Sequence, residues 1–337
     1  MPSSASEPSA WQRLAPVTDL VTPMAVRVAA TLRLADVMAG GAETVDDLAD
    51  RTGTDADALG RLLRHLTCHG VFAEPSPGRF TINETADLLR SDHPSGARMW
   101  FDLDGFGGRM DLAFTELMHT VRTGRPAWEA VFGAPFWDHL AADADLAASF
   151  DATMAGSLRT TAATGYDWSG VRHVVDVGGG TGALVAEVLL ANPEIRATLV
   201  DLPDTVARGR RLLAERALDG RCEFAGQSFF DPLPAGGDVY LLSAVLHDWG
   251  DEQATAILRR CAEAAGATGR VVIVESHGTA GDDPGMFAEM DLRMLVLCGG
   301  RERSLEDYGT LAAAAGLATA DVRTTPSGHV IIECRAA

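Results

Sequence analysis

The sequence predicts an α/β protein in which a mostly parallel sheet, with helices on both faces, follows a mostly helical N-terminal domain. Beyond Tyr166, apolar β-branched runs alternate with helical stretches, which is typical of a parallel sheet buried on both sides. The preceding residues, from about 100 to 160, look helical and carry no strand signal. We therefore expect three parts: residues 1–100, a helical linker and substrate-pocket segment at 101–164, and the α/β domain at 165–337.

The N-terminal part has the element order of a winged helix-turn-helix. A helical pattern runs from about Thr22 to Met38 and ends at Gly40-Gly41. Two further helices are expected, one opened by a capping-box-like Thr44 and ending near Gly53, the other opening at Thr54–Asp57. A hairpin follows, formed by Val71-Phe72 and Phe80–Ile82 around a turn at Pro75–Gly78.

The C-terminal part has the strand pattern of a doubly wound sheet. Its expected buried strands are Val171–Val177, Ala197–Val200, Asp238–Leu242 and Arg270–Val274. Val330–Cys334 is expected to form a last strand, and an antiparallel position at the edge of the sheet is open to it.

Composition excludes several classes of partner. The net charge is −19, so nucleic acid and anionic membranes are poor partners. The polar N-terminus lacks the features of a signal peptide, and no apolar run of about 18 residues appears. The five cysteines are odd in number and form no CxxC pair, which favours a reducing compartment. We expect a cytoplasmic protein without a membrane span.

A glycine-rich loop at 174–182, VVDVGGGTG, is the strongest local signal. It follows a strand and opens a helix at Ala183–Leu190, and Gly178, Gly180 and Ala183 match the G-x-G-x-x-G/A pattern of dinucleotide sites. Asp201 lies 21 residues after Gly180, at the end of the next strand, where a carboxylate can accept hydrogen bonds from both ribose hydroxyls. A plain tight turn is the alternative, which this context disfavours.

The cofactor could be a nicotinamide dinucleotide or S-adenosylmethionine, since both contain adenosine. Asp176 precedes the glycines, and a carboxylate there would repel a pyrophosphate but favour a sulfonium or amino group. No separate catalytic domain follows the nucleotide fold, so the chemistry must take place on its own loops. Both features favour S-adenosylmethionine over the nicotinamide dehydrogenase alternative.

His247 is the leading candidate for chemistry. It follows the apolar strand that ends near Ser243, and ligands of open α/β sheets bind outside the carboxyl ends of the strands. A helix-capping or core histidine is the plain alternative. A metal held by His247, Asp248 and Asp251 is another, but no second cluster supports it and we expect no metal.

The motifs together resemble the class I small-molecule O-methyltransferases, which include plant caffeate- and chalcone-type enzymes and bacterial antibiotic-tailoring enzymes. The resemblance covers nearly the whole chain. It is carried by DVGGGTG at 176–182, VDLP at 200–203, SFFDPLP at 228–234, VLHDW at 245–249, DLRML at 291–295 and GGRERS at 299–304.

The resemblance implies a Rossmann-like methyltransferase domain, an N-terminal winged-helix dimerisation domain and S-adenosylmethionine as cofactor. It implies that His247 is the general base and that Glu275 and Glu302 flank and orient it. The implied cofactor residues are Gly178 and Gly180 at the methionine end, Asp201 at the ribose, Ser228 and Phe229 at the adenine, and Ser243 near the carboxylate. The chain departs from the family where Gln227-Ser228 replace a common Gly-Asp.

We expect the methyl acceptor to be a phenolic hydroxyl of a small secondary metabolite such as an aromatic polyketide antibiotic intermediate. Its pocket should lie between the helical segment and the cofactor crevice, because flexible methionines and aromatic rings there suit flat apolar ligands. The candidates are Phe150, Met154, Trp249, Met290 and Met294, although such residues at helical spacing are more often plain core.

Two further alternatives remain. A transcription regulator is disfavoured because the expected recognition helix, Thr54–Gly70, mixes acidic and basic residues and has no basic face. Relatives on this scaffold can catalyse hydroxylation instead of methylation, although His247 argues for methyl transfer. Because the apolar helix at Thr22–Met38 belongs to a domain without a DNA-binding face, we expect a homodimer through the N-terminal half.

Overall fold

The computed structural model describes residues 9–157, 165–276, 284–325 and 329–337, and the side chains of 155–157 are outside the description. Contacts between residues divide the chain into two compact units, Met1–Arg109 and Met110–Ala337. The separate linker segment at 101–164 stays a prediction.

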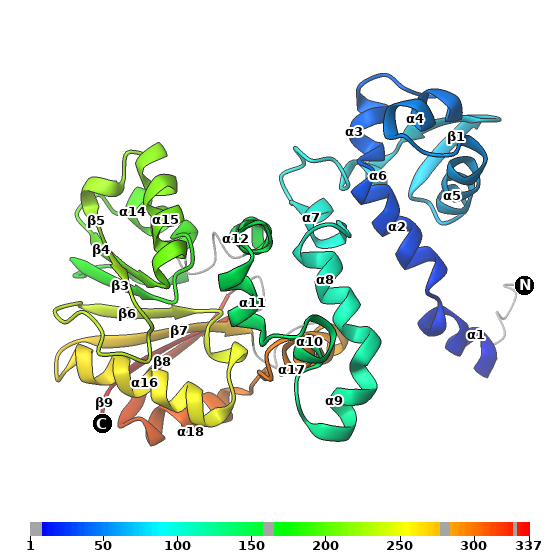
Figure 1. Ribbon diagram of the computed structural model, residues 1–337. Coiled ribbons are helices and arrows are strands. Elements are labelled where there is room, and N and C mark those ends of the chain that lie inside the picture. The colour runs from blue at the N-terminus through cyan, green and yellow to red at the C-terminus, as the bar shows by residue number, and fades with distance from the viewer. Residues whose placement is uncertain (1–8, 158–164, 277–283, 326–328) are drawn as a thin grey trace, which may run out of the picture. The chain divides into compact units, whose positions relative to one another are not determined.

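The first unit is a small helical domain with a hairpin (Figure 1). Its elements are α1 Ala10–Leu14, η1 Ala15–Thr18, α2 Val21–Thr31, α3 Leu34–Ala39, α4 Val45–Thr52, α5 Ala56–Cys68, β1 Phe72–Ser76, β2 Arg79–Ile82, α6 Glu84–Asp87 and α7 Ala97–Phe101. Thr44 caps α4 by accepting from the Asp47 N–H, and Gly53 ends that helix in the left-handed conformation. Antiparallel pairing of β1 with β2 confirms the expected hairpin.

The prediction of one helix from Thr22 to Met38 was wrong. Arg33 adopts the left-handed conformation, with φ 52°, and separates α2 from α3. Neither glycine nor proline marks this break, so no turn signal was present in the sequence. The break lets Ala29 and Ala30 of α2 and Leu34 and Ala35 of α3 enter the same buried cluster.

Helices connect the first unit to the sheet of the second. They are α8 Phe106–Ala113, which crosses the division between the units, η2 Phe114–Glu116, α9 Leu117–Thr123, α10 Ala127–Phe132, α11 Phe136–Ala142 and α12 Ala144–Ser157. No strand occurs in the described residues of this stretch, as expected.

The second unit contains a seven-stranded sheet of order β5-β4-β3-β6-β7-β9-β8. The strands are β3 His173–Val177, β4 Arg196–Asp201, β5 Cys222–Gly226, β6 Val239–Ser243, β7 Arg270–Ser276, β8 Leu317–Thr324 and β9 His329–Ala336. The first five pair in parallel and the last two are antiparallel. The expected last strand is therefore antiparallel, but it lies inside the sheet, because β8 covers its outer side.

Helices cover both faces of this sheet (Figure 1). α14 Ala183–Ala191 and α15 Pro203–Glu215 lie on one face, and α16 Asp251–Ala265 and α18 Leu305–Ala314 lie on the other. Alternate residues of each strand serve two separate cores, so that Val174 belongs to the first cluster and Val175 to the second. The short turns η3 Asp219–Arg221 and η4 Leu246–Asp248 and the helix α17 Pro284–Leu297 complete the unit.

Within the described residues, no helix is both long and apolar enough to span a membrane.

Candidate active site

The glycine loop joins β3 to α14 in a conformation that glycine makes possible. Gly178, Gly180 and Gly182 have φ values of 70°, 59° and 76°, a region that other residues rarely adopt. A Cβ atom at Gly178 would lie 2.9 Å from Val245 Cγ2 and 3.4 Å from Phe229 Cε1. The loop is therefore in close contact with the segments after β5 and β6, both of which contain predicted site residues.

Asp201 lies at the end of β4 and joins the glycine loop. Its Oδ2 accepts from the Gly180 N–H at 2.9 Å, and its Oδ1 accepts from the Leu202 N–H at 2.7 Å. Each carboxylate oxygen keeps a further lone pair for another donor. Burial raises the pKa of Asp201, while these two N–H groups oppose the rise. The arrangement fits a carboxylate that receives ribose hydroxyls.

Asp176 is buried beneath the loop. A Cβ atom at Gly179 would lie 2.4 Å from Asp176 Oδ2, for which the described residues provide no hydrogen-bond partner. Burial, together with the charge of Asp201, raises the pKa of Asp176 to about 7. A buried carboxylate oxygen without a partner is costly. It fits a site that is completed by a positively charged or N–H-bearing ligand.

The segment after β5 lies beside the loop. Gln227 connects it to β4, because its N–H donates to Asp201 O at 2.9 Å while its side chain donates to Pro232 O. Ser228 Oγ accepts from the Phe230 N–H at 3.2 Å. Gln227 and Ser228, at which the chain departs from the family pattern, thus form hydrogen bonds within the turn that carries Phe229. Ser243 is the last residue of β6 and pairs with Val274.

The turn that carries His247 follows β6. Ala244 adopts the left-handed conformation, with φ 51°, and the chain then enters η4. Glu275, at the end of β7, receives the Val245 and Leu246 N–H groups on Oε1 at 3.0 and 2.8 Å. Glu275 therefore holds the backbone of the turn, and its Oε2 lies 3.9 Å from His247 Nδ1.

Glu302 holds the imidazole ring itself. Its Oε1 lies 2.8 Å from His247 Nδ1, and the Glu302 side chain is fully buried. Although its neighbours in the sequence, Arg301 and Arg303, are charged, Glu302 does not form a surface ion pair. With Nδ1 engaged, Nε2 is the ring atom available to a ligand, and Asp248 Oδ1 lies 3.6 Å from it.

Three carboxylates control the charge of His247. Burial acts to lower the pKa of the imidazole, but the charges of Glu275 and Asp248 and the hydrogen bond that Nδ1 donates to Glu302 outweigh it and raise the pKa to about 10. Burial raises the pKa of Asp248 to about 7, against the effect of His247. The site therefore stabilises an imidazolium.

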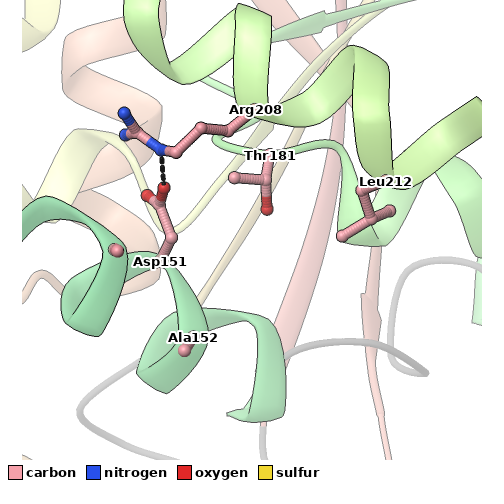
Figure 2. Close-up of a pocket in the computed structure, with 6 residues that line it drawn as sticks. Asp151, Ala152, Thr181, Arg208 and Leu212 are labelled. Carbon is pink, nitrogen blue, oxygen red and sulfur yellow. Dashed lines mark hydrogen bonds and ion pairs between the residues drawn. The ribbon is translucent and has the colours of Figure 1, made fainter.

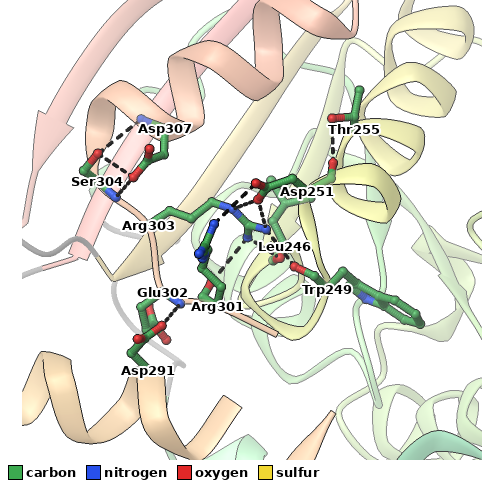
Figure 3. A network of polar contacts seen from close by, with 10 residues as sticks. All are labelled: Leu246, Trp249, Asp251, Thr255, Asp291, Arg301, Glu302, Arg303, Ser304 and Asp307. Atoms are coloured by element: carbon green, nitrogen blue, oxygen red, sulfur yellow. Dashed lines mark hydrogen bonds and ion pairs between the residues drawn. The ribbon is translucent and has the colours of Figure 1, made fainter. Parts of the chain in front are cut away.

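Two residues that the sequence reasoning missed connect Glu302 to the rest of the site. Asp291 of α17 accepts from the Glu302 N–H at 2.9 Å (Figure 3). Arg303 is buried and bonds the carbonyls of the His247 turn. Both lie in quoted motifs, DLRML and GGRERS, but nothing in those motifs distinguishes a buried arginine from an exposed one.

The acceptor-pocket candidates lie on three elements. Phe150 and Met154 are on α12, Met290 and Met294 are on α17, and Trp249 follows η4. Phe150 and Trp249 both contact Trp137 of α11, which the sequence reasoning did not single out, and Trp137 and Trp249 stack with ring centres 6.1 Å apart. Trp249 also packs edge-to-face with Phe229 and Phe230, which brings it to the expected adenine side.

A pocket of about 210 Å³ opens beside the glycine loop (Figure 2). It lies between Thr181 of that loop, α12 and α15, and an ion pair joins Arg208 Nε to Asp151 Oδ2 across it. The charges of both residues act on Asp201. The pocket thus borders the expected ribose position.

Asp251 does not join His247 at a metal site. Its Oδ1 receives Arg303, and its Oδ2 lies 3.4 Å from Arg301 Nη1 (Figure 3). Within the described ranges, no group of three or more histidine, cysteine or acidic side chains has an arrangement that could hold a metal ion.

Two family models match the chain. The model of the O-methyltransferase domain matches residues 114–318. The model of the O-methyltransferase dimerisation domain matches residues 17–92.

Individual proteins are similar along nearly the whole chain. The 2,7-dihydroxy-5-methyl-1-naphthoate 7-O-methyltransferase of Streptomyces carzinostaticus is 48% identical, over 90% of this chain and 91% of that protein. The aclacinomycin 10-hydroxylase of Streptomyces purpurascens is 46% identical, over 92% and 84%. The crystal structure of an O-methyltransferase from neocarzinostatin biosynthesis, in complex with S-adenosylmethionine and 2-hydroxy-5-methyl naphthoic acid, superposes with a TM-score of 0.89 at 46% identity and covers 96% and 98% of the two chains.

Proposed function

This chain belongs to the S-adenosylmethionine-dependent O-methyltransferases, and from that premise we propose that it methylates a phenolic hydroxyl of a small aromatic secondary metabolite of hydroxynaphthoate size. The observation that carries the proposal is the imidazole of His247, held through Nδ1 by the buried Glu302 with Nε2 left for the acceptor.

The proposed cofactor residues bind different parts of S-adenosylmethionine. When bound, S-adenosylmethionine would supply an activated methyl group, whose carbon an oxygen nucleophile attacks in line while the thioether S-adenosylhomocysteine leaves. We assign Gly178 and Gly180 to close backbone approach, Asp201 to the ribose hydroxyls, and Asp176 to the positively charged end. Ser228 and Phe229 border the adenine, and Ser243 lies near the carboxylate. Orientation of the two reactants is the main contribution of such a site.

Nε2 of His247 takes up the proton of the acceptor hydroxyl. A phenol has a pKa of about 10, close to that of this imidazole, so proton transfer from the acceptor oxygen to Nε2 needs little free energy. At neutral pH, the same pair of phenolate and imidazolium forms when an acceptor that is already ionised binds next to the protonated ring of His247. Glu302 fixes the ring and Glu275 fixes the turn, and their charges stabilise the imidazolium in either case.

The acceptor class is supported by two of the comparisons. One relative is named for a dihydroxylated methylnaphthoate, and a solved O-methyltransferase structure contains a hydroxylated methylnaphthoic acid. In this chain, Trp137 of α11 stacks on Trp249 and is itself packed against Phe150 of α12, and flat apolar surfaces suit a fused aromatic acceptor. We propose that Phe150, Met154, Met290 and Met294 complete the pocket and that Trp249 lies where acceptor and adenine meet.

The hydroxylase among the relatives makes hydroxylation the second candidate. The decisive experiment incubates the protein with S-adenosylmethionine labelled in the methyl group and a panel of hydroxynaphthoates and related phenolic polyketides. Methyl transfer gives a labelled product and S-adenosylhomocysteine in equal amounts. Product that gains oxygen without label would replace the proposal by the hydroxylase alternative.

We also propose a cytoplasmic homodimer. The described N-terminal residues expose apolar side chains: Trp11, Leu14, Val17, Leu20 and Val21. Such a surface fits a second copy of the dimerisation domain. The support for a cytoplasmic location is that all five cysteines are free thiols.

A further inference from the structure

Arg303 is a buried cation directly behind the catalytic turn. Its side chain has no exposed surface, and its guanidinium makes bonds through all three nitrogens (Figure 3). Nε donates to Asp251 Oδ1 at 3.1 Å, Nη1 donates to Leu246 O at 2.8 Å and Arg301 O at 3.3 Å, and Nη2 donates to Trp249 O at 2.7 Å and Asp251 Oδ1 at 2.8 Å. An arginine has five N–H donors, and these bonds use all of them.

The two carbonyls of the turn that Arg303 bonds lie on either side of His247 in the chain. Leu246 O and Trp249 O bracket His247 and Asp248, so one planar guanidinium holds both sides of the segment that carries the imidazole. Asp251, the first residue of α16, provides the compensating charge. A lysine, with a single ammonium group, could not bond both carbonyls and the carboxylate in this fixed plane.

The same chain segment brings Glu302 to the ring. The Arg301 N–H donates to His247 O at 2.7 Å, and a Cβ atom at Gly300 would lie only 2.1 Å from that oxygen. The segment therefore lies directly against the turn. From this segment, the Glu302 side chain bonds Nδ1 of His247, while the Arg303 side chain bonds the backbone carbonyl of Leu246.

We propose that Arg303 is a positioning residue for methyl transfer, which locks the turn carrying His247 onto the segment carrying Glu302 and thereby fixes the hydrogen bond between their side chains. The inference rests on the proposed role of His247 as the base. It differs from a purely structural role, because it ties Arg303 to the orientation and protonation of one imidazole.

The test compares Arg303→Lys and Arg303→Met with a matched arginine. Arg221 also donates to several backbone carbonyls, those of Leu189, Asn192, Pro193 and Ile195, but at the opposite end of the strands. Arg221→Lys therefore reports the cost of losing such bonds away from the site. The kcat, KM, pH profile and melting temperature are measured for each variant, and calorimetry gives the affinity for S-adenosylhomocysteine.

We expect Arg303→Lys to lower kcat by about 10–100-fold, the effect of a slightly misplaced catalytic group, with little change in cofactor affinity. The rise of kcat with pH should move to lower pH, because a looser Glu302 raises the pKa of His247 less. Arg221→Lys should lower the melting temperature and leave kcat and its pH profile as in the parent. Arg303→Met should lower kcat further than Arg303→Lys does and should move the rise of kcat with pH further. If Arg303→Met does not fold, the result for Arg303→Lys decides.

A readout without turnover separates this inference from the proposed function. In protein with labelled histidine, NMR titration of the His247 ring, assigned by its loss in His247→Ala, should show a lower pKa in Arg303→Lys and in Glu302→Gln. An unchanged His247 titration together with unchanged kcat would overturn the positioning role, even if stability falls. Absence of methyl transfer by the parent enzyme would instead count against the proposed function and leave the titration as the test of Arg303.

Discussion

His247 and Glu302, 55 residues apart in the sequence, meet at 2.8 Å between Nδ1 and Oε1, with the carboxylate fully buried. This bond engages Nδ1 and leaves Nε2 as the ring nitrogen for the proposed acceptor. It also makes the protonation of the imidazole depend on a residue from a different part of the chain.

Replacement of His247 by alanine should lower kcat by about 10²–10⁴-fold at neutral pH, the usual contribution of a positioned acid–base group. Affinity for S-adenosylhomocysteine should change little, because the ring is not assigned to the cofactor. Activity of the variant should recover at alkaline pH, where a phenol ionises unaided. Steady-state kinetics and calorimetry check these outcomes. Full activity at neutral pH would mean that orientation alone drives transfer, and parallel loss of cofactor binding would make His247 structural.

The pH dependence should show the raised pKa of His247. Activity of the parent should keep rising with pH well above the ordinary imidazole value of about 6.5, because the proton leaves the ring only near its raised pKa of about 10. Glu302→Gln should lower the maximum rate and move the rise to lower pH. The same acceptor in both measurements removes its own ionisation from the comparison. Glu306→Gln, at an exposed neighbour, is the control, and a shift in that variant too would point to a general charge effect.

Asp201→Ala should weaken S-adenosylmethionine binding by about 1–3 kcal/mol, the range for hydrogen bonds to a charged group. The reason is the loss of the carboxylate that both supports Gly180 and faces the expected ribose. Calorimetry measures the difference, with the exposed Asp204→Ala on the following helix as control. Unchanged affinity of Asp201→Ala would contradict the ribose assignment.

Asp176→Asn should stabilise the ligand-free protein at pH 8. The folded-state pKa of Asp176, about 7, is higher than the pKa of an unfolded aspartate, so its ionised form disfavours folding. The parent should lose this part of its stability as pH rises from about 4 to about 7, and the variant should not. Removing a buried charge of this kind is worth about 1–3 kcal/mol. Melting curves from pH 4 to pH 8 test the sign, while weaker cofactor binding by the variant would support the assigned role.

Aspartate at Val17 and Leu20 should convert a dimer into monomers. These side chains are 79% and 76% exposed, and charges there would be costly in an apolar interface between copies. Light scattering at micromolar concentration measures the mass. Leu190→Asp, which is also exposed but lies on α14, is the matched control and should not change it. A monomeric parent at that concentration would refute the dimer proposal.

Features with local causes were predictable. The glycine loop, the following helix and the strand ahead of Asp201 are close in sequence, and their spacing requires the turn that the structure contains. The strands β5 and β8 were missed for a physical reason. Both lie at edges of the sheet, and β8 exposes most of its residues, so neither shows the continuous apolar run of a buried strand.

The sequence by itself determined the α/β class, the glycine loop with Asp201 at the end of the next strand, and the placement of His247 at the carboxyl end of a buried strand. Only the tertiary structure decided that Glu275 bonds the N–H groups of the histidine turn, that Glu302 bonds the imidazole, and that Arg303 bonds the carbonyls of the turn. In sequence, Glu302 and Arg303 belong to a charged run, which is typical of a solvated surface because burying a charge is costly. They are buried because the fold brings His247, the carbonyls of its turn and Asp251 together as hydrogen-bond partners from distant segments.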